Sequence, residues 1–164
     1  MISIREIGFE EVGKVHDLAH IIWPPTFAEI LTKEQISYML NWMYDIDTLR
    51  KQMNEGHQFF LAEEDSNPIG FMGIQAFYPD ESSIKIHKLY VLTEIQGKGV
   101  GRLLVNKAEE IGLQKEVSRL ILNVNRFNQA VSFYHHIGFK VLYEENIDIG
   151  NGYWMEDYVM GLSL

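Results

Sequence analysis

Cysteine is absent from this chain of 164 residues. Disulfide bonds, thiolate metal sites and cysteine nucleophiles are therefore excluded, and a reducing cytoplasm is the expected compartment. No apolar run approaches the roughly 20 residues that a membrane-spanning helix needs. Residues 1–10 carry acidic side chains and no long apolar segment, unlike a signal peptide. We therefore expect a cytoplasmic protein without a membrane partner.

Positive charge is also scarce. The chain has 14 Lys and Arg against 23 Asp and Glu, a formal net charge of −9 at pH 7. This balance argues against a nucleic-acid partner and agrees with a cationic small substrate, or with a charge that only maintains solubility. Apolar residues (46%) and charged residues (23%) are ordinary for a globular protein, and no repeat or low-complexity run divides the chain. Residues 1–164 are expected to form one domain.

The hydrophobic pattern predicts an α+β fold with a mixed, mostly antiparallel central sheet flanked by helices. Strands are predicted at residues 3–7, 58–62, 69–77, 83–91, 119–124, 139–143 and 153–162, the last two joined by a loop that contains Gly150-Asn151-Gly152. Helices are predicted at residues 10–22, 33–44, 46–55 and 100–115, and between Asn128 as the cap and Gly138 as the stop. Trp23-Pro24-Pro25-Thr26-Phe27 is expected to break the first helix, because proline lacks the N–H group.

The stretch Gln96-Gly97-Lys98-Gly99-Val100-Gly101-Arg102 lies between a predicted strand and a predicted helix. Its glycines let the backbone approach a ligand, and the first N–H groups of the helix have no partner inside it. With the helix dipole and the cations Lys98 and Arg102, these groups suit a phosphate or pyrophosphate. A tight strand-to-helix connection without a ligand explains such a turn equally well.

Two nucleotide-binding loops do not fit this stretch. A Walker-type loop needs a hydroxyl residue after its lysine, but Gly99 follows Lys98. A dinucleotide fingerprint needs its last glycine one position later and an acidic residue about twenty positions on, where Arg119 and Leu120 stand. The remaining ligand is a pyrophosphate held by backbone and cations without a metal.

Two motifs resemble those of the GNAT superfamily of N-acetyltransferases. Gln96-Gly97-Lys98-Gly99-Val100-Gly101 is similar to the acetyl-CoA pyrophosphate loop Gln/Arg-x-x-Gly-x-Gly/Ala, and it follows a strand that ends in Leu89-Tyr90-Val91. Asn128-Gln129-Ala130-Val131-Ser132-Phe133-Tyr134, followed by Gly138-Phe139, resembles the second motif. The resemblance extends from about Ile69 to the end of the chain. It implies the acyl-CoA N-acyltransferase fold and acetyl transfer from acetyl-CoA to an amine.

A narrower resemblance concerns the acceptor. Residues 23–27, 86–91 and 150–160 look similar to bacterial polyamine N-acetyltransferases of the spermidine/spermine type. A small amine, such as a polyamine, is therefore the expected acceptor. A protein N-terminus or lysine remains an alternative acceptor, and a CoA-binding regulatory module without turnover is an alternative of another class. Exposed strand edges leave room for a homodimer.

The resemblance also implies roles for particular residues in binding acetyl-CoA and in acetyl transfer. Tyr134 matches the general acid that protonates the departing thiolate, and a backbone N–H near Val91 would stabilise the charged carbonyl oxygen. His87 is the local candidate for the base, although many relatives carry glutamate in that neighbourhood or use water chains. The expected cofactor contacts are Leu89, Tyr90, Val91, Gln96, Gly97, Lys98, Gly99, Val100, Gly101, Arg102, Asn128 and Tyr134.

The expected acceptor contacts are Trp23, Thr26, Phe27, Asp148, Tyr153, Glu156 and Asp157. The acidic members of this set are candidates for a distal ammonium group, although a solvated strand face explains such positions as well. The aromatic cluster at residues 23–27 can form a pocket wall, although large apolar side chains are more often part of a hydrophobic core. No metal is expected, because His16 and His20, four residues apart, have no acidic ligand or general-base glutamate between them.

Overall fold

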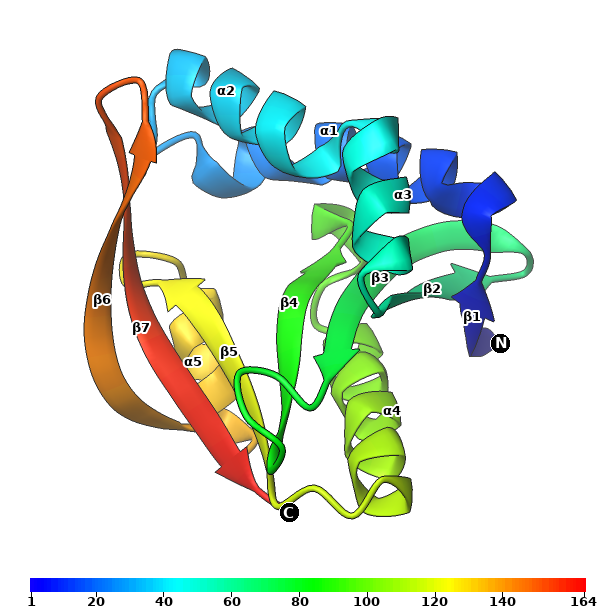
Figure 1. The fold of residues 1–164 in the computed structure, drawn as a ribbon. Coiled ribbons are helices and arrows are strands. Elements are labelled where there is room, and N and C mark those ends of the chain that lie inside the picture. The colour runs from blue at the N-terminus through cyan, green and yellow to red at the C-terminus, as the bar shows by residue number, and fades with distance from the viewer.

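A computed structural model describes all residues, 1–164, and contains one seven-stranded sheet in the order β1-β2-β3-β4-β5-β7-β6 (Figure 1). Its strands are β1 (Ile2–Ile7), β2 (His57–Glu64), β3 (Asn67–Ala76), β4 (Ser83–Val91), β5 (Arg119–Asn125), β6 (Lys140–Gly150) and β7 (Tyr153–Ser163). Only β4 and β5 pair in parallel, and every other neighbouring pair is antiparallel. The predicted mixed, mostly antiparallel sheet is confirmed.

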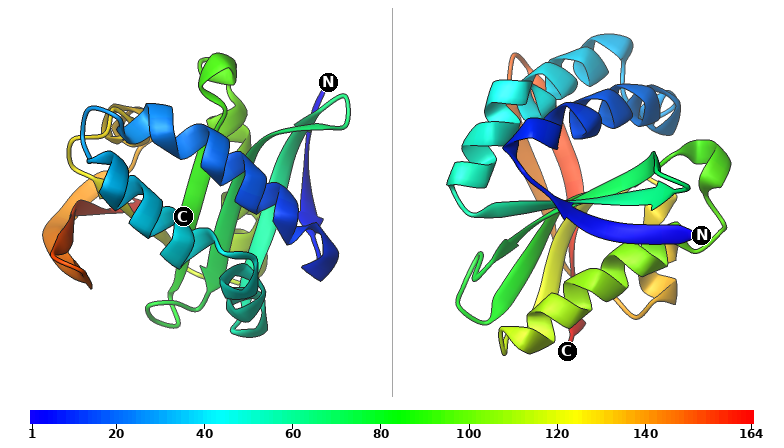
Figure 2. Two further views of the ribbon diagram at one scale, coloured as in Figure 1. Left: turned by 90° about the horizontal axis from the view of Figure 1, so that it is seen from above. Right: turned by 90° about the vertical axis from the view of Figure 1, so that its right-hand side faces the viewer.

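Helices cover both faces of the sheet (Figure 2). One face carries α1 (Val12–Phe27), α2 (Lys33–Tyr44) and α3 (Ile46–Asn54), and the other carries α4 (Val100–Gln114) and α5 (Ala130–His136). Two short 3-10 turns, η1 (Phe9–Glu11) and η2 (Thr93–Ile95), complete the elements. Two hydrophobic cores result, with 20 buried residues on the α4 side and 17 on the α1 side. None of the helices combines the length and the apolar character that crossing a membrane requires.

The first helix continues through its two prolines, so the predicted break at Trp23 was wrong. Pro24 and Pro25 lie inside α1 and are exposed. The carbonyls that they leave without a helical partner belong to His20 and Ile21, which also lie on the exposed side and can bind water. Burial of the apolar stripe on the opposite side of α1 then outweighs the two lost hydrogen bonds.

The C-terminal strands form a longer hairpin than the sequence pattern indicates. The predicted strand at 139–143 continues as β6 to Gly150, so the predicted loop before Tyr153 is reduced to a tight turn. Asn151 and Gly152 take φ values of 56° and 78° there, the left-handed pair that a two-residue hairpin turn requires. The pattern failed because most of β6 faces solvent and lacks an apolar alternation.

The sheet opens between β4 and β5. These strands pair only from Ser83–Ile86 to Arg119–Leu122 and then diverge (Figure 1). On the other side of β4, Gly73 pairs with Lys88 while the next residue of β3, Ile74, pairs with Ile86, so His87 is an extra residue in a bulge. A bulge bends its strand, and here it coincides with the start of the divergence.

Candidate active site

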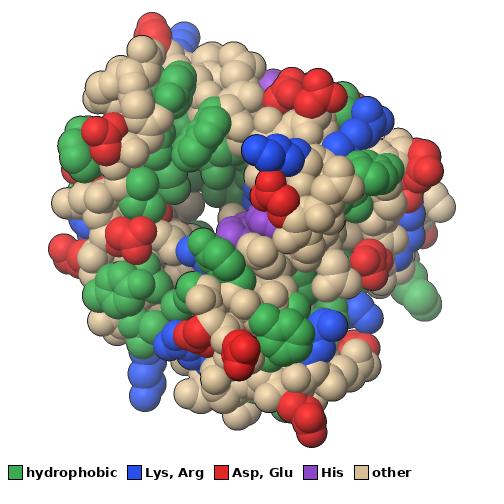
Figure 3. Space-filling model, in the orientation of Figure 1, with side chains coloured by type: hydrophobic (Ala, Val, Ile, Leu, Met, Phe, Trp, Pro, Cys, Tyr) green, Lys and Arg blue, Asp and Glu red, His purple; other side chains and the backbone are tan.

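A cavity of about 1430 Å³ occupies the opening between β4 and β5. Its lining includes residues of α4 and α5 on one face of the sheet and of α1 and α2 on the other. Residues of β7, a strand of the sheet itself, complete the wall. The space-filling view shows the molecule hollowed at this place, with histidine side chains on the wall (Figure 3). Because ligand pockets usually measure about 300–1,000 Å³, this cavity has room for two substrates to meet.

The glycine-rich loop lies at the α4 end of the cavity. Gly97 and Gly99 have φ values of 88° and 83°, and an added Cβ would meet nothing within 4 Å, so backbone conformation rather than space requires glycine. Gly99 precedes α4 without any side-chain cap, which leaves the first-turn N–H groups available to an anion. Arg102 lines the cavity, whereas Lys98 is exposed and lies outside the lining.

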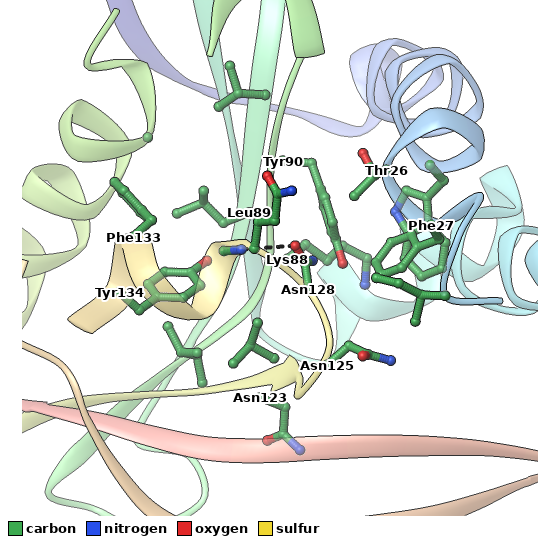
Figure 4. A pocket seen from close by; sticks show the side chains of 18 of the residues that line it. Thr26, Phe27, Lys88, Leu89, Tyr90, Asn123, Asn125, Asn128, Phe133 and Tyr134 are labelled. Atoms are coloured by element: carbon green, nitrogen blue, oxygen red, sulfur yellow. Dashed lines mark hydrogen bonds between the residues drawn. The ribbon is translucent and has the colours of Figure 1, made fainter. Parts of the chain in front are cut away.

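Tyr134 extends from α5 into the same cavity (Figure 4). Its ring packs edge-on against Phe133 and Phe139, with centroid distances of 5.2 and 5.4 Å. The hydroxyl is directed toward β4. Burial raises the pKa of Tyr134, so the hydroxyl keeps its proton at neutral pH. This geometry suits a proton donor to a group bound between α5 and β4.

Asn128 combines a cap with a place in the cavity wall. Its Oδ1 accepts a hydrogen bond of 2.9 Å from the backbone N–H of Ala130, the first residue of α5. The predicted capping bond is thus present, although the helix begins two residues later than Asn128 itself. The residue also lines the cavity, so the two interpretations of Asn128 are compatible.

The last part of β4 presents alternate side chains to the two cores. Leu89 and Val91 pack toward α4, while Tyr90 packs toward α1. No residue of β4 after Ile86 pairs with β5, so the backbone of this segment faces the cavity along its β5 edge. Gln96 ties the glycine-rich loop to the end of the strand, because its Nε2 donates to the Val91 carbonyl at 3.3 Å.

His87 lines the cavity, but its surroundings make it a weak base. The ring stacks on His57 at 4.4 Å, and Nε2 lies 3.0 Å from Gln75 Oε1. Burial, and after it the positive charges of His57, Lys88 and Lys85, lower the pKa of His87 to about 3. The imidazole is therefore neutral at pH 7 and has a low affinity for a proton.

Lys88 is a buried cation that the sequence did not single out as a site residue. Only 4% of it is exposed, and its Nζ donates to Gln52 Oε1 at 3.0 Å and lies 5.2 Å from the centre of the Tyr44 ring. Burial lowers the pKa of Lys88 to about 8. Its charge disfavours a second proton on the neighbouring imidazoles.

The aromatic residues of α1 belong to the core and to the cavity at once. Trp23 and Phe27 are buried, with ring centroids 4.6 Å apart, and the Trp23 ring lies 5.5 Å from that of Tyr90. All three line the cavity with Thr26, whose hydroxyl donates to the Ile22 carbonyl at 2.7 Å. Thr26 and Phe27 lie on the other side of the end of β4 from Tyr134 (Figure 4).

Of the acidic candidates, only Asp157 lines the cavity. Asp148 is exposed and its Oδ1 accepts from the N–H of Gly150 at 2.9 Å, a turn contact at the tip of the hairpin. Glu156 is exposed outside the lining, and Tyr153 packs on Tyr38 with a centroid distance of 5.2 Å. The structure therefore does not bring these three residues into the cavity.

Besides Lys88, sequence reasoning missed further polar residues of the lining, among them Glu29, Asn123 and Asn125. Glu29 follows α1 at the mouth, and its position depends on the unexpected length of that helix. Asn123 and Asn125 alternate along β5 and point away from the α4 core (Figure 4). Asn123 lies inside the predicted strand 119–124, where an asparagine was a signal that could have identified it, whereas Asn125 falls just beyond that prediction. No group of three or more His, Asp and Glu side chains is placed to hold a metal ion.

Comparison with known proteins identifies relatives along most of the chain. Residues 27–162 match the family model of the acetyltransferase (GNAT) domain. The chain is 30% identical over 146 residues to the spermidine N(1)-acetyltransferase of Thermoplasma acidophilum. The aligned region covers 85% of this chain and 89% of that protein. It is 32% identical over 103 residues to the peptidyl-lysine N-acetyltransferase YjaB of Escherichia coli, 62% of either chain.

A similar fold is found among solved structures. The crystal structure of the PaiA N-acetyltransferase from Thermoplasma acidophilum in complex with coenzyme A superposes with a TM-score of 0.83 at 28% identity. The superposition covers 100% of this chain and 99% of that chain. The arrangement of sheet and helices around the cavity is therefore one that, in that protein, accompanies bound coenzyme A.

Proposed function

The chain belongs to the GNAT acetyltransferase family, whose members use acetyl-CoA, and from this premise we propose that it acetylates a primary amine of a small molecule, a polyamine in particular. The observation that carries the choice of acceptor is a pair of hydrogen bonds that spans the α1 side of the cavity. Tyr38 of α2 donates to the Ile149 carbonyl at 2.6 Å, and Gln35 donates to the Trp154 carbonyl at 2.9 Å. These bonds join α2 to the β6–β7 hairpin, whereas a protein acceptor needs an open groove.

In this proposal acetyl-CoA enters from the α4 side. The pyrophosphate binds the N–H groups at the start of α4, with Arg102 beside them. The pantetheine arm extends along the unpaired edge of β4 and bonds to the backbone of Leu89 and Val91. The acetyl group then lies between β4 and Tyr134, at the place where the cavity passes through the sheet.

The chemistry is a direct attack of the amine on the thioester. A C–N bond forms while the carbonyl oxygen takes up charge, which a backbone N–H near Val91 stabilises. The C–S bond then breaks, and Tyr134 donates a proton toward the sulfur, whose thiol has a reference pKa of about 8.5. The amide and free CoA leave through opposite ends of the cavity.

The test of this function is CoA release from acetyl-CoA, detected as free thiol, with a panel of amines. The panel contains spermidine, spermine, putrescine, aminoglycosides, amino acids and lysine-containing peptides. Selective turnover of spermidine or spermine is expected. Turnover of peptides alone would transfer the assignment to a peptidyl-lysine acceptor, as the likeness to YjaB allows. CoA binding without any turnover would favour the regulatory module.

Glu29→Gln is expected to raise the KM for spermidine by about 1.5- to 5-fold, because exposed charge pairs contribute about 0.2–1 kcal/mol. Glu29 is an exposed carboxylate of the lining, without an ion-pair partner, and in this proposal it meets a distal ammonium group at the mouth. A monoamine lacks that group, so its KM should not change. Glu34→Gln, an exposed change on α2 outside the lining, is the control. Equal effects on spermidine and monoamines would contradict this role.

Gly99→Ala is expected to reduce the free energy of unfolding by about 1–2 kcal/mol and to weaken CoA binding several-fold, because its left-handed φ of 83° strains any residue with a Cβ. Relief of this strain displaces the N–H groups that hold the pyrophosphate. Gly13→Ala is the matched control, because Gly13 lies in α1 with open space around it. This variant should increase the free energy of unfolding by up to about 1 kcal/mol. Urea unfolding and calorimetric titration with CoA measure both effects, and unchanged CoA affinity in Gly99→Ala would contradict this binding mode.

A further inference from the structure

Asp157 of β7 is a buried carboxylate without a cation partner. Only 3% of the residue is exposed, and it forms no salt bridge. Its side chain accepts one hydrogen bond, of 3.1 Å, from Asn123 Nδ2 to Oδ2, so Oδ1 is left for another donor, and the residue lines the cavity. Buried carboxylates are normally paired with a charge, so this one is arranged for a partner that the protein itself does not supply.

The carboxylate is held in a fixed orientation. Lys85 of β4 donates from Nζ to Asn123 Oδ1 at 2.8 Å, which directs the amide nitrogen of Asn123 toward Asp157. Asn125, which also lines the cavity, stands directly opposite Asp157 in the β5–β7 pairing. Asp157 therefore lies beside the end of β5, where the cavity passes between the diverging strands.

The charges around Asp157 set its affinity for a proton. Burial raises the pKa of Asp157, a change that the carboxylate of Glu145 on β6 reinforces. The Asn123 hydrogen bond, Lys85 on β4 and Arg126 after β5 act in the opposite direction. Burial, and after it the charges of Tyr134 and Asp157, raises the pKa of Tyr90 on β4. The same desolvation that favours a protonated carboxyl favours a neutral amine beside it. Proton transfer from an ammonium group to Asp157 is therefore easier here than in water.

We propose that Asp157 Oδ1 binds the ammonium group of the acceptor and removes its proton before the attack on acetyl-CoA. The inference rests on the proposed function. The ammonium N–H bond breaks and the proton moves to Oδ1, which leaves a lone pair on nitrogen. That lone pair forms the C–N bond. As the C–S bond breaks, Tyr134 donates its hydroxyl proton to the sulfur and accepts in exchange the surplus proton of the newly bonded nitrogen. Asp157 releases its proton to solvent when the product leaves.

The test compares the pH dependence of kcat/KM in wild type and in Asp157→Asn. At pH 7 the kcat/KM of the variant is expected to be about 100-fold below that of wild type, within the usual range for loss of a general base. It should then rise about tenfold per pH unit, because the fraction of unprotonated amine rises. Affinity for CoA, measured by calorimetry, should not change. The control is Glu144→Gln, an exposed carboxylate on β6 outside the lining, which should keep the wild-type profile. A loss below about threefold, or a variant profile parallel to that of wild type, would overturn the proposal.

A second measurement needs no variant. Two acceptors of equal size are compared at pH 7, an alkylamine and its β-fluorinated analogue, whose ammonium group is more acidic. Wild type should use them with kcat/KM values within about threefold, because the enzyme supplies the base. If kcat/KM for the fluorinated amine exceeds that for the alkylamine by the ratio of their unprotonated fractions at pH 7, no residue of the enzyme takes the proton. If wild type acetylates neither a panel amine nor either member of this pair, the proposed function fails together with the role of Asp157. If wild type is active and Asp157→Asn is equally active, only the role of Asp157 fails.

Discussion

Tyr134→Phe is expected to lower kcat by about 100-fold while KM for acetyl-CoA stays within about twofold of wild type. The substitution removes one oxygen atom and keeps the ring that packs between Phe133 and Phe139. Fold and cofactor affinity should therefore survive. The loss should fall on the step in which charge reaches the sulfur, because that is the step the hydroxyl serves in the proposed mechanism.

The size of this effect follows from the leaving group. General acids contribute about 10²- to 10⁴-fold, and a thiol with a reference pKa of about 8.5 already leaves more readily than an alkoxide or an amide nitrogen. Burial raises the pKa of Tyr134. In the proposed mechanism the phenol therefore stabilises the thiolate mainly as a hydrogen-bond donor and transfers its proton only as nitrogen releases one. Both arguments favour the lower end of the range.

Steady-state kinetics with saturating amine, together with calorimetric titration of CoA, measure the expected split between kcat and affinity. The matched control is Tyr143→Phe, which removes the same atom from a residue on β6 that is 54% exposed. It should leave kcat and CoA affinity unchanged. If Tyr134→Phe kept more than about a third of wild-type kcat, Tyr134 would lose its assignment as the acid.

The parts of the site that local sequence determines were predictable. The start of α4 follows from glycines at 97 and 99, whose φ values are positive, and from an apolar stripe at helical spacing. Asn128 and its hydrogen bond to Ala130 are likewise a local matter of a polar side chain before a helix. Strand β4 was predicted with its observed bounds because it alternates regularly before the bulge.

The parts that depend on distant contacts were not predictable. Local proline chemistry ends a helix at Trp23, but packing of Trp23 and Phe27 against Tyr90 extends α1 to Phe27. That extension carries Glu29 to the cavity mouth. β6 has a largely exposed sequence, and its length comes from pairing with β7 rather than from its own pattern.

Electrostatic character was hidden from the sequence for a similar reason. Glu156 and Asp157 are adjacent acids, and only the register of β5 with β7 turns the second one inward beside Asn123 and Asn125. His87 was the obvious base by type, yet its own burial, followed by the charges of His57, Lys88 and Lys85, lowers its pKa. Residue type suggested the chemistry, while burial decided which residue can perform it.

Trp23→Ala is expected to reduce the free energy of unfolding by about 3–5 kcal/mol, the usual loss when a buried Trp or Phe is cut to Ala. Only 2% of Trp23 is exposed, and its ring contacts those of Phe27, Tyr44 and Tyr90. No neighbouring side chain can fill the space, because each of these rings is itself fixed by other core contacts. The wall opposite Tyr134 should then loosen, so KM for the amine should rise in any fraction that remains folded.

Urea unfolding measures this loss, with Trp42→Ala as the control. Trp42 lies on α2, is 49% exposed and is outside the cavity lining, so its replacement should change the free energy of unfolding by less than about 0.5 kcal/mol. Trp23→Phe should fall between the two, since it retains a ring and removes an indole N–H that has no hydrogen-bond partner. A loss below about 1 kcal/mol in Trp23→Ala would mean that the aromatic cluster lines the acceptor site without supporting the core. In that case the two functions of residues 23–27 would be separable, and acceptor pockets could be altered there without a loss of stability.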